Sequence, residues 1–367
     1  MNTMNEKYPV IEINTDAIAN NSRVVCHALA KHGVKTAGVI KFSDGAKEIC
    51  QAYLDGGCSQ LASSRVVHLK DIKGWFPGVP TLLLRIPMIC EADEVVEYAD
   101  YSLNSEAEVI KALSDSCVKL NKDHKVVLML DIGDRREGVV TFDDLTALAA
   151  YAESLPRITV AGVGTNYGCQ SGVLPDDENL EMVAEGSRRV EKTVGHKLEI
   201  VSACSSSSFI RISQGKTYPA EISHARVGGY IANPYNMRIN RCVDIPEMRE
   251  DTVCLKAMVV ESKEKPGVAA GHIGKNWKGE TLTFGESGPT VRTIVAVGSQ
   301  DIADAMNLVP MADGVKVIGG SSDHVVLDTT ASSHKFVPGD IIEFRLRYGA
   351  MLCAFSTRHI TKKYIHD

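Results

Sequence analysis

The sequence lacks the features that would place the protein in a membrane or on nucleic acid. No apolar stretch of about twenty residues occurs, and the first residues are polar and unlike a signal peptide, so we expect no membrane partner. Basic residues are not in excess. The 367 residues carry a formal net charge of −6, which argues against nucleic acid as the main partner. The composition, with 44% hydrophobic and 23% charged residues, is typical of a soluble globular protein.

The cysteines also lack a pattern. Ten are scattered along the chain, with no Cys-x-x-Cys pair and no spacing typical of zinc ligands. Several, such as Cys50, Cys254 and Cys353, lie in apolar segments, as reduced core thiols do. We therefore expect a cytoplasmic protein without a bound metal.

Short apolar runs alternate with segments of helical periodicity over the first two thirds of the chain. The runs lie at 36–41, 60–63, 81–86, 101–103, 125–131, 159–164, 198–203 and 222–227. The clearest helical stripe runs from Ala46 to Leu54 and stops at Gly56-Gly57. Eight strand candidates separated by helices predict an α/β fold, a closed parallel TIM (β/α)8 barrel, which we place at residues 8–235.

The pattern changes after about residue 240. Apolar and polar residues alternate over 252–259, and further β-like runs follow at 293–297, 314–319, 323–328 and 340–346. This predicts a C-terminal all-β domain at residues 240–367, with Pro234 to Pro246 as the junction.

One charged residue stands at the end of a predicted barrel strand. Lys41 follows the apolar run Ala37–Ile40 and precedes a turn that contains Gly45. Barrel strands present catalytic groups at this end. Desolvation there would lower the pKa of the amine and provide the neutral nucleophile that forms Schiff bases. The alternative is a lysine that only reaches out to solvent.

Two further polar segments follow predicted strands. Asp131–Gly138 contains Arg136, whose planar guanidinium could bind a carboxylate, although a charged surface turn is the alternative. Asn166 and Tyr167 could pack on a flat ligand or form an ordinary turn.

Two more segments have the groups that a phosphate needs. Ser205–Ser208 offers hydroxyls and consecutive backbone N–H groups, and a flexible linker is the alternative. Gly228 and Gly229 permit close approach of the backbone to a phosphate, and Arg226 lies beside them.

In this order the lysine, the arginine loop, the serine loop and the Arg-x-Gly-Gly segment resemble the alanine racemase superfamily of fold-type III pyridoxal-phosphate enzymes. Within it, the likeness is to ornithine racemases and their broad-specificity relatives. It covers nearly the whole chain. Further matching blocks are Ile11–Ile18, Leu83–Met88, Ser102–Glu106, Gly298–Asp301, Ser321–His324 and Tyr348–Ala350.

The resemblance implies a homodimer with its active site at the interface, and pyridoxal 5'-phosphate joined to Lys41. The phosphate would lie against Ser206 and the backbone of Gly228 and Gly229. Arg226 would face the pyridine nitrogen, and since a permanent cation cannot accept the ring proton, the cofactor becomes a weaker electron sink that favours racemisation. The remaining implied contacts are Arg136 for the substrate and Asn166 for the cofactor ring.

The sequence departs from the family at the second catalytic base. Alanine racemases use a tyrosine after a glycine in the β-domain, and here that position is Ser299. Racemisation needs a proton donor on each face of the intermediate. His324, which Asp323 could tune, is our candidate, with Tyr348 in reserve; a structural histidine is the alternative. Met129 also replaces a modified lysine that helps to hold the arginine in some relatives.

These features predict a racemase that interconverts L- and D-amino acids by abstraction of the α-proton. The small Ser299 favours ornithine or another long, basic amino acid over alanine, with Asp134, Glu137 or Glu106 as possible partners of its distal ammonium group. The alternatives are a decarboxylase or a D-amino-acid lyase of the same fold, or a non-catalytic pyridoxal-phosphate carrier. Zinc-dependent lyases have a His-x-Cys pair in the β-domain, and Tyr348–Cys353 contains no histidine. Carriers consist essentially of the barrel alone.

Overall fold

The structure is a computed structural model that describes residues 7–276, 279–281 and 288–367. The chain divides into two compact units. One is Thr15–Glu250, and the other combines the chain as far as Asn14 with Asp251–Asp367. None of the described helices is long and apolar enough to span a bilayer.

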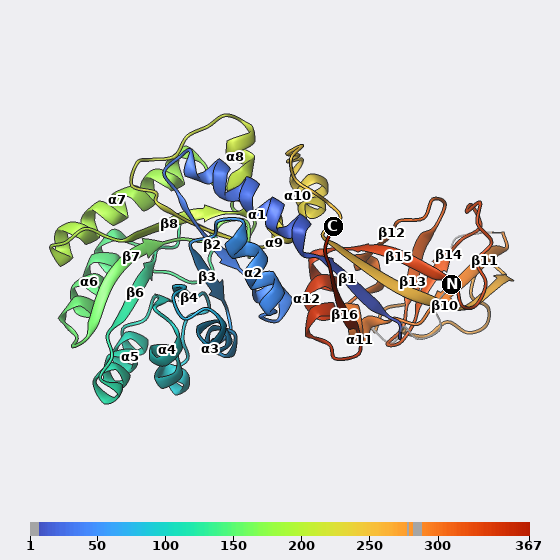
Figure 1. Ribbon diagram of the computed structural model, residues 1–367, viewed down its shortest axis with the longest axis horizontal. Helices are drawn as coiled ribbons and strands as arrows, with labels where there is room; N and C mark the ends of the chain where they lie inside the picture. Colours follow the sequence, from blue (N-terminus) through green and yellow to red (C-terminus); the bar gives the residue numbers. More distant parts are fainter. Residues whose placement is uncertain (1–6, 277–278, 282–287) are drawn as a thin grey trace. The chain divides into compact units, whose positions relative to one another are not determined.

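The unit Thr15–Glu250 is a closed barrel of eight parallel strands, as predicted (Figure 1). Each apolar run that we assigned to the barrel forms one of its strands, and every neighbouring pair is parallel. The strands are β2 (Lys35–Val39), β3 (Gln60–Ser63), β4 (Thr81–Leu83), β5 (Tyr101–Asn104), β6 (His124–Met129), β7 (Ile158–Gly164), β8 (Ile200–Ser205) and β9 (His224–Val227).

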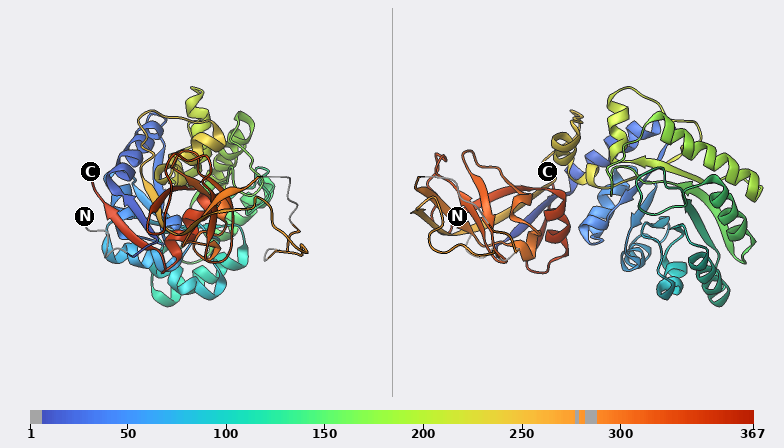
Figure 2. Two further views of the ribbon diagram at one scale, coloured as in Figure 1. Left: turned by 90° about the vertical axis from the view of Figure 1, so that its right-hand side faces the viewer. Right: turned by 180° about the vertical axis from the view of Figure 1, so that it is seen from behind.

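Helices surround these strands, and Figure 2 shows the arrangement from behind. The predicted helix after Lys41 is α2, and its apolar stripe is buried. Three short 3-10 turns also occur in this unit, at Lys41–Ser43, Ile89–Glu91 and Ser206–Ser208. The helices are α1 (Thr15–Ala30), α2 (Lys47–Asp55), α3 (Val66–Trp75), α4 (Ala92–Tyr98), α5 (Ala107–Leu120), α6 (Phe142–Ser154), α7 (Asp177–Val194), α8 (Phe209–Ser213), α9 (Gly229–Ala232) and α10 (Pro234–Arg241).

The barrel interior is filled by small and branched side chains, with buried histidines on two of its strands. The His224 ring nitrogens lie 2.9 Å from Ser202 Oγ and 3.0 Å from Gln60 Oε1. Burial lowers the pKa of His224 to about 3 and that of His124 to about 4, so both are neutral near neutral pH. The interior cluster consists of Ala37, Val39, Ala62, Leu82, Leu103, Val127, Met129 and Ile200.

The second unit is built mainly of β-strands, and all five β-like runs predicted there form strands. Most of its strand pairs are antiparallel, and two short helices, α11 (Ser299–Ile302) and α12 (Tyr348–Ser356), interrupt them. The strands are β1 (Val10–Asn14), β10 (Val253–Lys265), β11 (Thr290–Val295), β12 (Leu308–Pro310), β13 (Lys316–Gly320), β14 (Val325–Asp328), β15 (Ile341–Leu346) and β16 (Thr361–Ile365).

The division of the chain differs from our domain boundaries at both ends. β1 pairs with β10 and β16, so it belongs to the β-rich unit and not to a barrel domain beginning at residue 8. Ion pairs strengthen this arrangement, since Glu12 lies 2.7 Å from Lys256 and 3.1 Å from Lys363. The proposed junction at Pro234 to Pro246 includes α10, which belongs to the barrel unit.

Candidate functional site

The predicted cofactor and substrate residues lie at the carboxyl ends of the barrel strands. Lys41 begins the 3-10 turn that follows β2, and Arg136 lies in the loop after β6. Asn166 follows β7, and Ser206 begins the 3-10 turn after β8. Because the carboxyl ends of parallel strands share one rim, the barrel brings these residues to one side, together with Arg226, Gly228 and Gly229 at the end of β9.

Lys41 has the electrostatic setting that its position predicted. Its side chain stays open to solvent, yet enough protein surrounds it for desolvation to lower the pKa of the ammonium group. Cys169 and Glu137 oppose this shift, whereas the positive charges of Arg136 and Arg226 add to it. The lowered pKa increases the neutral fraction of Lys41, the form that can accept a proton or attack a carbonyl.

Arg136 is held by a carboxylate and a thiol. Its Nη2 donates to Glu137 Oε1 at 2.6 Å, and its Nη1 donates to Cys169 Sγ at 2.6 Å. Desolvation opposes ionisation of both groups in the ion pair, but their mutual attraction outweighs it, so the pKa of Arg136 is raised and that of Glu137 lowered. The ion pair and the thiol contact fix the orientation of the Arg136 side chain.

Two of the three acidic residues that we considered for a distal ammonium group have partners within the protein. Asp134 is buried and accepts hydrogen bonds from the backbone N–H groups of Gln170 and Ser171, so it joins two rim loops and is not presented to a substrate. Glu137 is engaged by Arg136. Glu106 is exposed and immediately precedes α5.

Arg226 combines a fixed orientation with a free donor. Its Nη2 donates to the carbonyl of Thr165 and, at 3.4 Å, to Asn166 Oδ1. Burial lowers its pKa to about 10, so it remains a cation at neutral pH. Nη1 is buried and has no hydrogen-bond partner among the described residues. Since an unpaired buried donor is costly, Nη1 suits an acceptor atom of a ligand, and a pyridine nitrogen is such an atom.

The serine loop leaves one hydroxyl available. Ser205 Oγ accepts the backbone N–H of Ser207, and Ser208 Oγ accepts that of Ser205. These bonds shape the 3-10 turn and occupy the flanking hydroxyls. Ser206 is half-buried, and its hydroxyl has no hydrogen-bond partner within the part of the chain that the structure describes. The loop therefore offers the Ser206 hydroxyl to a ligand.

Gly228 lies where no side chain fits. A Cβ atom there would be 2.5 Å from the carbonyl oxygen of Val39 in β2, too close for any other residue. The buried Tyr53 donates its hydroxyl to the Gly228 carbonyl at 2.9 Å. The close packing brings the backbone after β9 beside the strand that precedes Lys41. Tyr53 lies within the helical stripe predicted from Ala46 to Leu54, and that pattern gives no sign of its contact with Gly228.

The predicted second-base residues lie in the β-rich unit. His324 is exposed in the turn between β13 and β14, and Tyr348 is the first residue of α12. Asp323 accepts hydrogen bonds from Gln300 Nε2 at 3.1 Å and from Ser322 Oγ at 2.6 Å. The Asp323 carboxylate thus fixes the turn, and no hydrogen bond between Asp323 and the His324 ring is found among the described residues.

Ser299 lies close to that turn. Its backbone N–H donates to the carbonyl of Ser321 at 3.0 Å, and the next N–H, of Gln300, donates to that of Ser322 at 3.1 Å. The start of α11 is thereby joined to the turn that carries His324.

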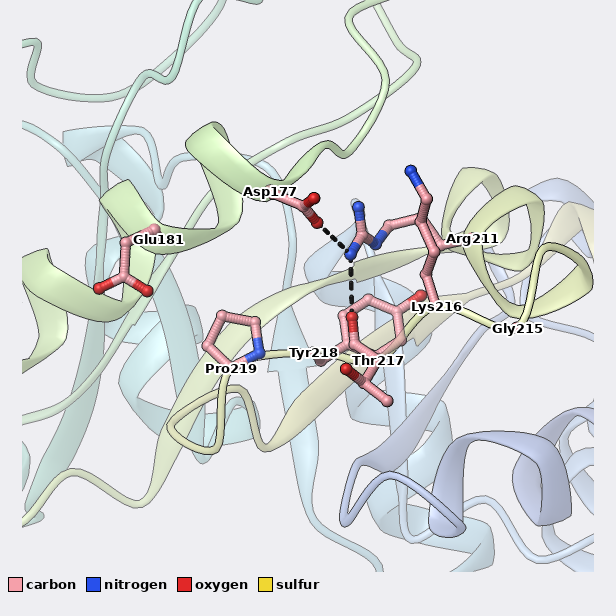
Figure 3. A pocket seen from close by; sticks show the side chains of 8 residues that line it. All are labelled: Asp177, Glu181, Arg211, Gly215, Lys216, Thr217, Tyr218 and Pro219. Carbon is pink, nitrogen blue, oxygen red and sulfur yellow. Dashed lines mark hydrogen bonds and ion pairs between the residues drawn. The ribbon is translucent and has the colours of Figure 1, made fainter.

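A surface pocket lies elsewhere on the barrel, beside the start of α7 (Figure 3). Arg211 spans it, with Nη2 bonded to Asp177 at 2.6 Å and to the carbonyl of Thr217 at 2.9 Å. Tyr218 donates its hydroxyl to the carbonyl of Ser208 and so supports the serine loop. Of the described residues that line the pocket, none is among those surrounding Lys41. They are Asp177, Glu181, Arg211, Gly215, Lys216, Thr217, Tyr218 and Pro219.

Comparison with known proteins gives the same family as the sequence motifs around Lys41, Arg136 and Arg226. The model of the alanine racemase N-terminal domain matches residues 13–233. The chain is 35% identical over 358 residues to an ornithine racemase of Acetoanaerobium sticklandii, covering 98% of this chain and 100% of that protein. It is 32% identical over 357 residues to a lysine racemase of Thermotoga maritima, covering 97% and 98%.

The fold has close relatives among solved structures. Alanine racemase from Bartonella henselae with covalently bound pyridoxal phosphate superposes with a TM-score of 0.72 at 16% identity, covering 98% of this chain and 100% of that one. The predicted fold class and resemblance are confirmed. The chain, with its rim lysine, its two arginines and its glycine-lined strand end, belongs to the alanine racemase family.

Proposed function

We propose that the protein is a pyridoxal-phosphate-dependent racemase of amino acids, with a long, basic amino acid such as ornithine or lysine as its substrate. The observation that carries the proposal is the gathering of Lys41, Arg136 and Arg226 at one rim of the barrel. The ornithine and lysine racemases that resemble it over nearly their full lengths support both the reaction and the substrate class.

The rim fits the cofactor at several points. Arg226 Nη1 is a buried donor that awaits an acceptor, and a pyridine nitrogen supplies one. The Ser206 hydroxyl can donate a hydrogen bond to a phosphate oxygen. Gly228 allows the backbone to come close to a phosphate, and Lys41 is the amine that binds the cofactor aldehyde.

Each of the side chains around the cofactor then has a separate role in the reaction. When bound, pyridoxal phosphate withdraws electrons from the α-carbon of the amino acid and acidifies its α-proton. Lys41 takes or returns that proton on one face, since its lowered pKa makes the neutral amine available. Arg226 keeps its charge and cannot accept a proton from the ring. Arg136, held by Glu137, binds the substrate carboxylate with its planar donors.

For the opposite face we infer that His324 supplies the second proton, with Tyr348 as the alternative. The support is that the turn carrying His324 is hydrogen-bonded to the start of α11, where Ser299 replaces the tyrosine of the family. The resemblance implies a homodimer, in which this face of one protomer would lie over the barrel of its partner. The ten free cysteines favour a reducing compartment such as the cytoplasm.

Steady-state kinetics on a panel of L-amino acids test the proposal. We expect kcat/KM for ornithine or lysine to exceed that for alanine at least tenfold, a difference of about 1.4 kcal/mol in transition-state binding. Alanine as the best substrate would contradict the substrate class and leave the racemase intact. Release of carbon dioxide or ammonia would instead identify a decarboxylase or lyase, and bound cofactor without turnover of any amino acid would identify a carrier.

A zinc-dependent lyase is the less favoured of these alternatives. The segment Tyr348–Cys353 lacks the histidine of a His-x-Cys pair. Among the described residues, no group of three or more His, Cys, Asp or Glu side chains could hold a metal ion.

A further inference from the structure

Two thiols from separate segments of the barrel unit lie side by side. Cys26 is in α1, and Cys58 lies between α2 and β3, 32 residues further along the chain. Their sulfur atoms are 3.8 Å apart, which is a non-bonded contact. The sequence does not reveal that these cysteines are neighbours, because their proximity depends on the packing of α1 against α2.

The backbone beside Cys58 also passes close to Cys26. Gly57, with φ at +100°, lies next to Cys58, and a Cβ atom placed on Gly57 would be 3.7 Å from the Cβ of Cys26. The chain therefore passes Cys26 at van der Waals distance. A disulfide needs sulfur atoms about 2.05 Å apart. From their separation of 3.8 Å the two sulfur atoms must therefore approach each other by roughly 1.8 Å to form the bond.

The two thiols differ in the way that a reactive pair requires. Cys26 is half-exposed, so an oxidant can reach it, whereas Cys58 is only 5% exposed. Ser22 Oγ lies 3.5 Å from the Cys58 sulfur and helps to fix it. The hydrogen bond from Cys58 lowers the pKa of the Cys26 thiol, which increases the thiolate fraction of the accessible partner.

We propose that Cys26 and Cys58 are a reversible oxidation site that forms an intramolecular disulfide with a low-molecular-weight disulfide as the oxidant. The Cys26 thiolate attacks one sulfur of the oxidant and releases the first small thiol. Cys58 then attacks the Cys26 sulfur of the mixed disulfide and releases the second. The two protein thiols lose two electrons and two protons, and the oxidant disulfide is reduced to two thiols that take them up.

The bond would join α1 to the connection between α2 and β3. Ser22 Oγ donates to the carbonyl of Tyr53 at 2.8 Å, and the Tyr53 hydroxyl holds the carbonyl of Gly228 at 2.9 Å. Closing a loop of this length restricts the unfolded chain. We therefore expect the oxidised protein to melt roughly 5 to 10 °C higher than the reduced protein.

In the test, the purified protein is first fully reduced and then incubated with oxidised glutathione. Free thiols are blocked with N-ethylmaleimide, and the digested protein is analysed by mass spectrometry. We expect a cross-linked peptide that joins Cys26 to Cys58, a mass lower by two hydrogen atoms, the higher melting temperature, and reversal of all three by dithiothreitol. The readout does not depend on racemase activity, so it stands apart from the proposed function.

Matched variants identify the pair. Cys26→Ser and Cys58→Ser should each abolish the cross-link and the shift, whereas Cys90→Ser, which removes an exposed thiol elsewhere, should retain both. Alkylation of both Cys26 and Cys58 after oxidation of the wild-type protein would overturn the proposal, and so would a cross-link from either to a different cysteine. Because these outcomes are measured on the wild-type chain, the proposal can be tested even if a variant fails to fold.

Discussion

Replacing Gly228 by alanine tests the proposed phosphate cradle, which consists of Ser206 and the backbone of Gly228 and Gly229. The added Cβ would lie 2.5 Å from the Val39 carbonyl oxygen and 2.9 Å from the Val39 Cβ. Real Cβ atoms keep at least 3.0 Å, so the backbone must move by at least 0.5 Å, the difference between 3.0 and 2.5 Å. Such overpacking costs about 1–3 kcal/mol, equivalent to a fall in melting temperature of roughly 2 to 12 °C in a protein of this size.

The same shift should weaken cofactor binding, because Gly228 is part of the proposed phosphate cradle. We expect the Kd for pyridoxal phosphate, measured by absorbance titration of the apoprotein, to rise at least about tenfold. Gly74→Ala is the control, since Gly74 is exposed in α3 and has no atom within 4 Å of an added Cβ; it should stabilise the protein by about 0.5–1 kcal/mol. A Gly228→Ala protein with unchanged melting temperature and affinity would refute the cradle.

Two further predictions concern charge. The pKa of His224 is about 3 in the folded protein, below its unfolded value of about 6.5. Between these two pKa values only the unfolded state binds a proton at this residue. The folded protein therefore loses stability as the pH falls from about 6.5 toward 3. His224→Gln should reduce the slope of unfolding free energy against pH between about 4.5 and 6 by about 1.4 kcal/mol per pH unit in urea titrations, and an unchanged slope would contradict the assignment. Arg136→Lys keeps the charge but loses the planar donors, so KM for the amino acid should rise at least about tenfold with a smaller change in kcat; a fall in kcat at constant KM would show that Arg136 does not bind the carboxylate.

The barrel could be predicted because each of its strands is a short apolar run between helices. Parallel strands buried on both faces read as such runs, and all eight were found. The rim residues followed from the same pattern, since a polar residue at the end of a buried strand must lie at the carboxyl end of the barrel. Lys41, which follows the run Ala37–Ile40, and Arg226, which lies in the last residues of its strand, were placed at the rim in this way.

Contacts between distant loops could not be predicted. β1 joins the β-rich unit through pairing with β10 and β16, which a local apolar pattern does not reveal. Cys169 binds Arg136 from another loop, and Tyr53 reaches Gly228 from a helix. From its place near Arg136 in the sequence, Asp134 looked available to a substrate. It is instead buried, and its carboxylate accepts hydrogen bonds from the loop after β7. In each case the partner is set by tertiary packing and not by neighbouring residues.

The most direct test of the central claim is hydrogen exchange at the α-carbon of L-ornithine in deuterium oxide, measured by NMR together with optical rotation. We predict that the wild-type protein incorporates deuterium and loses optical activity in parallel, and that Lys41→Ala does neither. Incorporation with retained configuration would mean that only one face has a competent base, and the assignment of His324 would fail. Two results would contradict the proposed racemase chemistry. One is equal exchange by the wild-type and Lys41→Ala proteins. The other is the absence of exchange when the wild-type protein, with bound cofactor, is given each amino acid of the panel.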